Sequence, residues 1–166
     1  MNMTSAQYIK RLNELLLKKK DYLLEILTLT QTQNKVITDD GLDRLDQLIK
    51  DKQLRIDEIN KLDEDFGTYY QRLISTLAIS HTNQLEKVML ENSASEGAKQ
   101  LKDITAEVLD LIRNISEVEK VNSQKSAILL EQFGNEIKKI NQGKKANNAY
   151  KPGAINAPSY FLDKKK

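Results

Sequence analysis

Side chains that could carry out catalysis or bind a metal are sparse in this chain. His81 is the single histidine, and there is no cysteine. Disulfides, thiolate catalysis and cysteine-based zinc sites are therefore excluded, and a metal at His81 would need carboxylates alone as its other ligands. We expect a structural or solvent-exposed role for His81, with no metal and no cofactor.

Paired carboxylates such as Asp63 and Asp65 are the remaining candidates for acid–base chemistry. On long helices such pairs usually form solvated faces or ion pairs. The sequence has no glycine-rich phosphate-binding loop, and a slender helical bundle offers no deep pocket to shift carboxylate pKa values. The sequence therefore predicts a protein that is not an enzyme.

The chain is 30% charged and 39% hydrophobic, and it has only two prolines and six glycines. This composition predicts long amphipathic helices, and these helices must position any functional site. Apolar residues recur every three or four positions over residues 5–36, which predicts a first helix capped by Thr4 or Ser5. Extra apolar positions such as Ile9 and Leu16 make its apolar face broad enough to contact two partners.

The motif TDDG at residues 38–41 separates this helix from a second one that begins near Leu42. Its heptad seam contains two polar residues, Lys52 and Asp63, and the sequence does not decide whether the helix continues through residues 67–93. A third helix has Asn122 and Lys125 in its seam. Asn122 either is buried and fixes the register or faces water. We expect this helix to stop at Gly143.

The fold class is therefore predicted to be all-α, an elongated antiparallel three-helix coiled coil or helical hairpin bundle with a flexible C-terminal tail. Residues 1–142 would form the body and residues 143–166 the tail. A homodimer remains open, because thin bundles leave apolar edges uncovered.

Two groups of apolar residues are candidates for binding a partner. Phe133, Ile137 and Ile140 form an apolar edge that is shifted off the heptad seam of the third helix. This edge either packs against the first helix or is exposed to a partner helix. The second group consists of spaced anchors in the polar tail, namely Tyr150, Tyr160, Phe161 and Leu162.

The charge is divided between body and tail. The whole chain has a net charge of +2. The tail has six lysines and one aspartate, a net charge of +5, which leaves −3 on residues 1–142. The body is therefore mildly acidic and does not suit nucleic acid, whereas the tail leaves weak binding to anionic lipid open. We expect neither a signal peptide nor a membrane-inserted segment, and therefore a cytoplasmic protein.

Three stretches together resemble a known family. They are YIKRLNELLLKKKDYLLEILTLTQTQ near the start, DDGLDRLDQLIKDKQLRIDEINKLDEDF at residues 39–66, and the ending from AYKPG to SYFLDKKK at residues 149–166. They resemble the FlgN family of flagellar export chaperones, in the form found in Firmicutes-like bacteria.

The resemblance implies a cytoplasmic chaperone that binds the hook–filament junction proteins FlgK and FlgL, prevents their premature polymerisation and delivers them to the flagellar type III export apparatus. The export gate and the export ATPase would be further partners. The resemblance also implies that clients contact the C-terminal region, where both groups of candidate residues lie. The alternatives are a generic coiled-coil adaptor or assembly protein, and a chaperone for another flagellar or type III secretion client.

Overall fold

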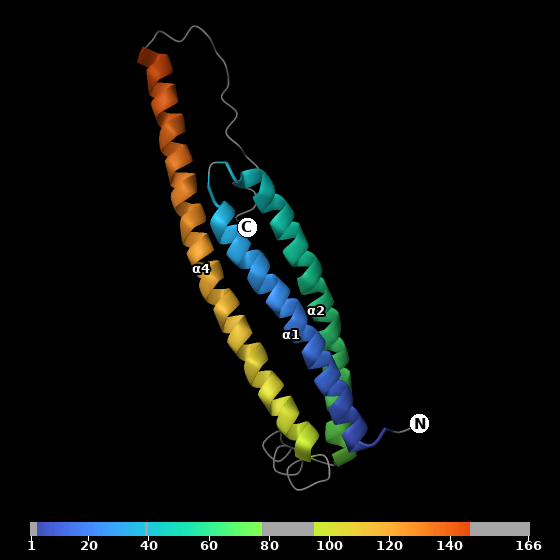
Figure 1. The fold of residues 1–166 in the computed structure, drawn as a ribbon. Helices are drawn as coiled ribbons and strands as arrows, with labels where there is room; N and C mark the ends of the chain where they lie inside the picture. Colours follow the sequence, from blue (N-terminus) through green and yellow to red (C-terminus); the bar gives the residue numbers. More distant parts are fainter. Residues whose placement is uncertain (1–2, 39, 78–94, 147–166) are drawn as a thin grey trace.

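A computed structural model describes residues 3–38, 40–77 and 95–146, and these residues form three long helices (Figure 1). Helix α1 spans Ser5–Val36, α2 spans Leu42–Leu77 and α4 spans Ser95–Ala146. The described residues contain no strand. The predicted all-α bundle is confirmed.

Helix α1 begins where the sequence provides a capping box. The Thr4 hydroxyl accepts a hydrogen bond from the backbone N–H of Gln7, and the Gln7 side chain accepts one from the backbone N–H of Thr4. This exchange satisfies two backbone donors that have no partner within the helix. Thr4 is therefore the cap, and the first helix has the bounds that the apolar spacing predicts.

Polar contacts fix the directions of the helices. Between α1 and α4, Asn13 pairs with Gly97 and Lys20 with Glu107, so residue numbers rise together and these two helices run parallel. Between α1 and α2, Lys19 bonds Asp63. The same interface pairs Glu25 with Arg55 and Gln33 with Lys52, so α2 runs antiparallel to α1 and to α4.

Helix α1 is the central element of the bundle. Close backbone approaches are concentrated between α1 and α2 and between α1 and α4, with few between α2 and α4. The broad apolar face predicted for α1 therefore does contact two partners. The shared core contains these buried residues: Tyr8, Ile9, Leu12, Leu16, Leu23, Ile26, Ile59, Leu73, Ala98, Leu101, Ile104 and Val108.

Aromatic residues reinforce the end of the bundle where α1 begins. The Tyr8 and Tyr69 rings lie 6.3 Å apart, and the Phe66 and Tyr70 rings stack at 6.0 Å. The Arg11 guanidinium lies 5.6 Å from the centre of the Tyr69 ring, within range of a cation–π contact. The contacts of Tyr69 with Tyr8 and Arg11 join the start of α1 to the last turns of α2.

The predicted stop of the third helix at Gly143 is wrong, because α4 continues to Ala146. A glycine inside a helix weakens it by roughly 1 kcal/mol but ends it only where the backbone turns left-handed. The second helix is continuous through Gly67 to Leu77. The rest of the open stretch, including His81, lies in residues 78–94, outside the described part of the chain.

Candidate functional site

The end of α4 extends beyond the other two helices. Asn34, near the end of α1, bonds both Asn122 and Lys125, and α1 ends two residues later at Val36. Figure 1 shows α4 continuing past the turn between α1 and α2. We call residues 130–146 the projecting segment, which is about 25 Å long at 1.5 Å per residue.

The core stripe of α4 continues into the projecting segment. Asn122 and Leu129 are buried, and Ser126 between them is half-buried. Phe133 and Ile137, at four-residue steps after Leu129, are half-buried, and Ile140 is 49% exposed. Steps of three and four residues keep side chains on one face of a helix.

The structure corrects the predicted register of this stripe. A strict heptad would place Lys125 in the seam, but Lys125 is exposed and its ammonium group bonds Asn34 of α1. The step from Asn122 to Ser126 is four residues where the heptad expects three, a stutter that locally unwinds a coiled coil. Phe133, Ile137 and Ile140 therefore follow the core stripe and are not shifted off it.

The opposite face of α4 provides a point of comparison. Ile128 is 56% exposed. It lies nine residues before Ile137, which is two and a half helical turns, so the two side chains point in opposite directions. Ile128 is an exposed isoleucine of the kind found on most protein surfaces, whereas Ile137 and Ile140 extend a core.

A polar layer joins the bundle just before the projecting segment. Asn122 is buried; its amide nitrogen donates to the Thr30 carbonyl at 2.9 Å, and its amide oxygen accepts from the Asn34 side chain at 2.9 Å. Of the two alternatives for Asn122, burial is therefore the correct one. Because a buried amide must find its partners, these bonds favour a single register of α4 against α1.

Lys52 brings α2 into the same layer. Its ammonium group donates to the Gln33 side chain at 2.7 Å and forms an ion pair with Glu119 of α4. Lys52 is buried, whereas the Glu119 side chain is 43% exposed. Lys52, one of the two polar residues predicted in the heptad seam of α2, therefore connects α2 to both α1 and α4.

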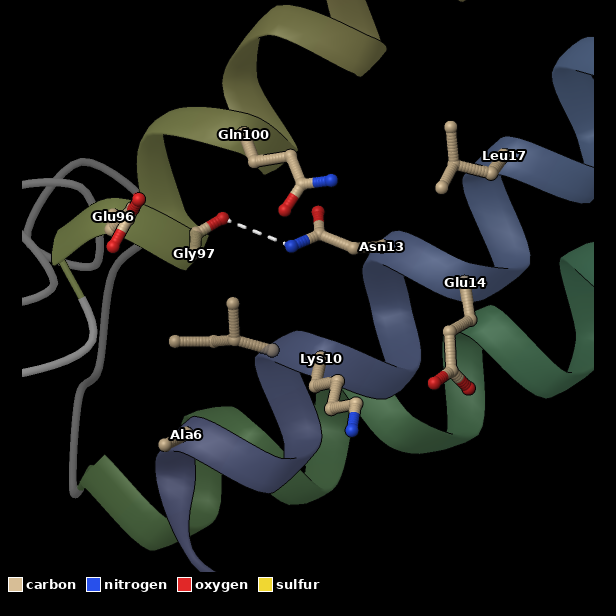
Figure 2. Close-up of a pocket in the computed structure, with 9 residues that line it drawn as sticks. Ala6, Lys10, Asn13, Glu14, Leu17, Glu96, Gly97 and Gln100 are labelled. Carbon is tan, nitrogen blue, oxygen red and sulfur yellow. Dashed lines mark hydrogen bonds between the residues drawn. The ribbon is translucent and has the colours of Figure 1, made fainter.

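A groove lies at the other end of the molecule, between the starts of α1 and α4 (Figure 2). Its volume is about 470 Å³, and Ile9, Leu17 and Gln100 are among the residues that line it. The Asn13 amide nitrogen donates to the Gly97 carbonyl at 3.0 Å, while its buried Oδ1 accepts no hydrogen bond from the described residues. Sequence reasoning did not single out Asn13. The available signal was its position directly after Leu12, which places it beside the core face of α1.

Among the described residues, the carboxylate candidates for acid–base chemistry do not assemble into a centre. Asp63 is the ion-pair partner of Lys19 at 2.7 Å, and Asp65 is exposed. Across the described ranges no cluster of His, Cys, Asp or Glu could hold a metal ion. The hydrogen bond that Arg11 donates to the Glu14 carboxylate raises the pKa of Arg11, and burial raises the pKa of the Tyr70 hydroxyl. Both shifts keep these groups in their usual protonation states.

The tail candidates fall outside the described residues. These are Tyr150, Tyr160, Phe161 and Leu162. Of the predicted partner-binding residues, the structure therefore places Phe133, Ile137 and Ile140 together on one face of the projecting segment.

Comparison with known proteins identifies the family. A sequence model described as FlgN protein matches residues 1–157. The chain belongs to the FlgN family. This is a family of flagellar export chaperones, whose members bind flagellar hook-associated proteins. No curated protein matched the chain, and no solved structure did.

The described helices add one observation about membranes. None of them has a stretch long and apolar enough to span a lipid bilayer.

Proposed function

We propose that this chain is an export chaperone for the hook–filament junction proteins FlgK and FlgL. It would hold them unpolymerised in the cytoplasm and deliver them to the type III export apparatus, and it would not act as an enzyme. Membership of the FlgN family supports this role. The observation that carries the proposal is the apolar stripe of the projecting segment, which continues the core of the bundle beyond α1 and α2.

The stripe suits a client whose apolar surface must be covered reversibly. Ile140 is 49% exposed and Ile137 is half-buried. Covering a large aliphatic side chain fully contributes about 1.5–3 kcal/mol. A few such residues supply affinity that still permits release, because binding also immobilises side chains and orders the client.

The tail is the second part of the proposed site. In this proposal Tyr150, Tyr160, Phe161 and Leu162 provide anchors in a polar, lysine-rich segment, and these anchors bury apolar area on the client. The neighbouring lysines would keep the free tail from self-associating. The body and the tail would thus act as separate parts, with the body holding the client's helices and the tail wrapping them.

The test is calorimetric titration of FlgK-type and FlgL-type proteins from the same organism into the full chain. We expect one-to-one binding with a micromolar or lower Kd. The double variant Ile137→Ser and Ile140→Ser should weaken binding at least tenfold. The triple tail variant Tyr160→Ser, Phe161→Ser and Leu162→Ser should also weaken it without reducing the helical circular dichroism signal.

Ile128→Ser is the matched control for the helix variants. It removes an exposed isoleucine from the same helix, and it should leave the Kd unchanged because Ile128 lies on the opposite face. Equal losses for Ile128→Ser and for the double variant would remove the stripe from the proposal. Absence of binding by the unaltered chain would contradict the proposed function and favour an adaptor with other partners.

A further inference from the structure

The sides of α2 and α4 that face each other are largely uncovered. Both helices pack on α1, but close backbone approaches between α2 and α4 are few. Because the axes of packed helices lie about 8–10 Å apart, α2 and α4 are further apart than a packed pair. The long side chain of Lys52 crosses this distance to Glu119, which is 43% exposed. The described helices therefore leave the position opposite α1 unfilled.

Apolar side chains border this position on both helices. Ile56 of α2 lies four residues after Lys52, about 40° further around the helix, on the side away from Arg55, which bonds α1. Ile112 of α4 lies seven residues before Glu119, within about 20° of it. Measured from the contact between Lys52 and Glu119, the two isoleucines lie at similar heights. We call the exposed apolar residues on these two sides the α2–α4 patch; they are 36–48% exposed and comprise Ile49, Ile56, Leu109 and Ile112.

Opposite charges border the α2–α4 patch on its two outer sides, away from α1. The border on α2 is acidic and consists of Asp46, Asp57 and Glu64. The border on α4 is basic and consists of Lys102, Arg113 and Lys120. Each row has steps of 11 and 7 residues, which are close to whole helical turns, so each row stays on one side of its helix. Because α2 and α4 are antiparallel, the two rows lie at matching heights.

We propose that the α2–α4 patch docks one amphipathic helix of the client, which lies opposite α1 and completes a four-helix arrangement. The inference rests on the proposed function and adds a second surface, on the body and separate from the projecting segment. The docked helix presents lysine or arginine toward α2, aspartate or glutamate toward α4, and apolar residues between them. It spans about 18 residues, or about 27 Å, which is the length of α2 from Asp46 to Glu64.

Two other occupants fit this surface less well. Residues 147–166 contain Pro152 and Pro158, and proline is strongly unfavourable in the interior of a helix, so this stretch does not match one continuous helix. A second copy of the chain would present the same pair of helices, and a pair does not fit a single position. One client helix with a charged residue on each flank matches both the width and the two borders.

Calorimetric titration of an FlgK-type or FlgL-type protein from the same organism into the full chain tests the patch. The double variant Ile56→Ser and Ile112→Ser should raise the Kd about tenfold and keep the helical circular dichroism signal. Leu54→Ser is the matched control and should leave the Kd unchanged, because Leu54 is 60% exposed and points about 160° away from Ile56. An unchanged Kd in the double variant overturns the inference and leaves the proposed function standing. No binding by the unaltered chain overturns both.

Asp57 and Glu58 form a matched pair for testing the acidic border. The two carboxylates are neighbours in the chain, but they point about 100° apart, and Glu58 lies on the side of α2 away from α4. Asp57→Asn should raise the Kd roughly two- to fivefold at low salt, with less effect at high salt, as expected for one exposed ion pair. Glu58→Gln should leave the Kd unchanged, and equal effects of the two variants would contradict the assigned border. A free chain that is a dimer in light scattering and becomes a monomer in the isoleucine double variant would assign the patch to a second copy and overturn the inference.

Discussion

Lys52 is expected to stabilise the bundle mainly through its aliphatic stem and much less through its charge. The side chain is 10% exposed. Lys52→Ala removes three buried methylenes, at about 0.8 kcal/mol each. It also leaves the oxygen of buried Gln33 without its donor, which costs about 1–3 kcal/mol. Regained side-chain entropy offsets up to about 2 kcal/mol, so we expect the free energy of unfolding to fall by roughly 1.5–5 kcal/mol.

Lys52→Met separates the stem from the charge. Methionine keeps a side chain of similar length, so the apolar burial remains. The lost ion pair contributes at most about 1 kcal/mol, because the Glu119 side chain is 43% exposed and can be rehydrated. Removing a buried ammonium group also abolishes its desolvation penalty. Gln33 loses its donor in both variants, so that cost of about 1–3 kcal/mol is common to them. The free energy of unfolding should therefore fall less in Lys52→Met than in Lys52→Ala, because the three methylenes are not lost.

Urea denaturation followed by circular dichroism measures both variants against the unaltered chain. Lys50→Ala is the matched control, since Lys50 lies two residues away on the same helix and its ammonium group pairs with Asp46 at an exposed position. Its effect should stay within about 0.5 kcal/mol. If Lys52→Met destabilised the protein as much as Lys52→Ala, the charge and not the stem would be the stabilising element, and the reasoning would be refuted.

Three further substitutions test the fold by denaturation. Gly41→Ala should lower the free energy of unfolding by about 2 kcal/mol or more, because the new Cβ would lie 2.0 Å from the Val36 carbonyl oxygen. Gly67→Ala should raise it by about 0.5–1 kcal/mol, because a Cβ there has no atom within 4 Å. A change of the same sign in both variants would contradict this reasoning. Leu12→Ala, at a fully buried position, should cost about 2–5 kcal/mol, and a loss below 1 kcal/mol would show that α1 is not the central element.

Apolar periodicity predicted the helical architecture well. The α1 bounds, its two-sided apolar face and the position of Lys52 in the seam of α2 all follow from spacing, because burial of an amphipathic face decides how such helices pack. Thr4 as the cap was one of two adjacent alternatives. The structure selects Thr4, because Gln7 at the third position after it completes the capping box.

The register of α4 could not be predicted from the heptad pattern. A step of four residues after Asn122 brings Ser126, and not Lys125, toward the core, and this choice depends on hydrogen bonds to Thr30 and Asn34 that only a folded α1 provides. The error carried forward to Phe133, Ile137 and Ile140, which were expected off the seam. Asn13 was missed because its partner is a backbone carbonyl, that of Gly97, and a sequence pattern does not reveal such a pairing.

The most direct test of the account is multi-angle light scattering of an equimolar mixture of the full chain with a FlgK-type or FlgL-type protein from the same organism. The account predicts a single species with the summed mass of one chain and one client, and no larger client assemblies. Separate species with the masses of the two unbound proteins, at concentrations of tens of micromolar, would contradict it.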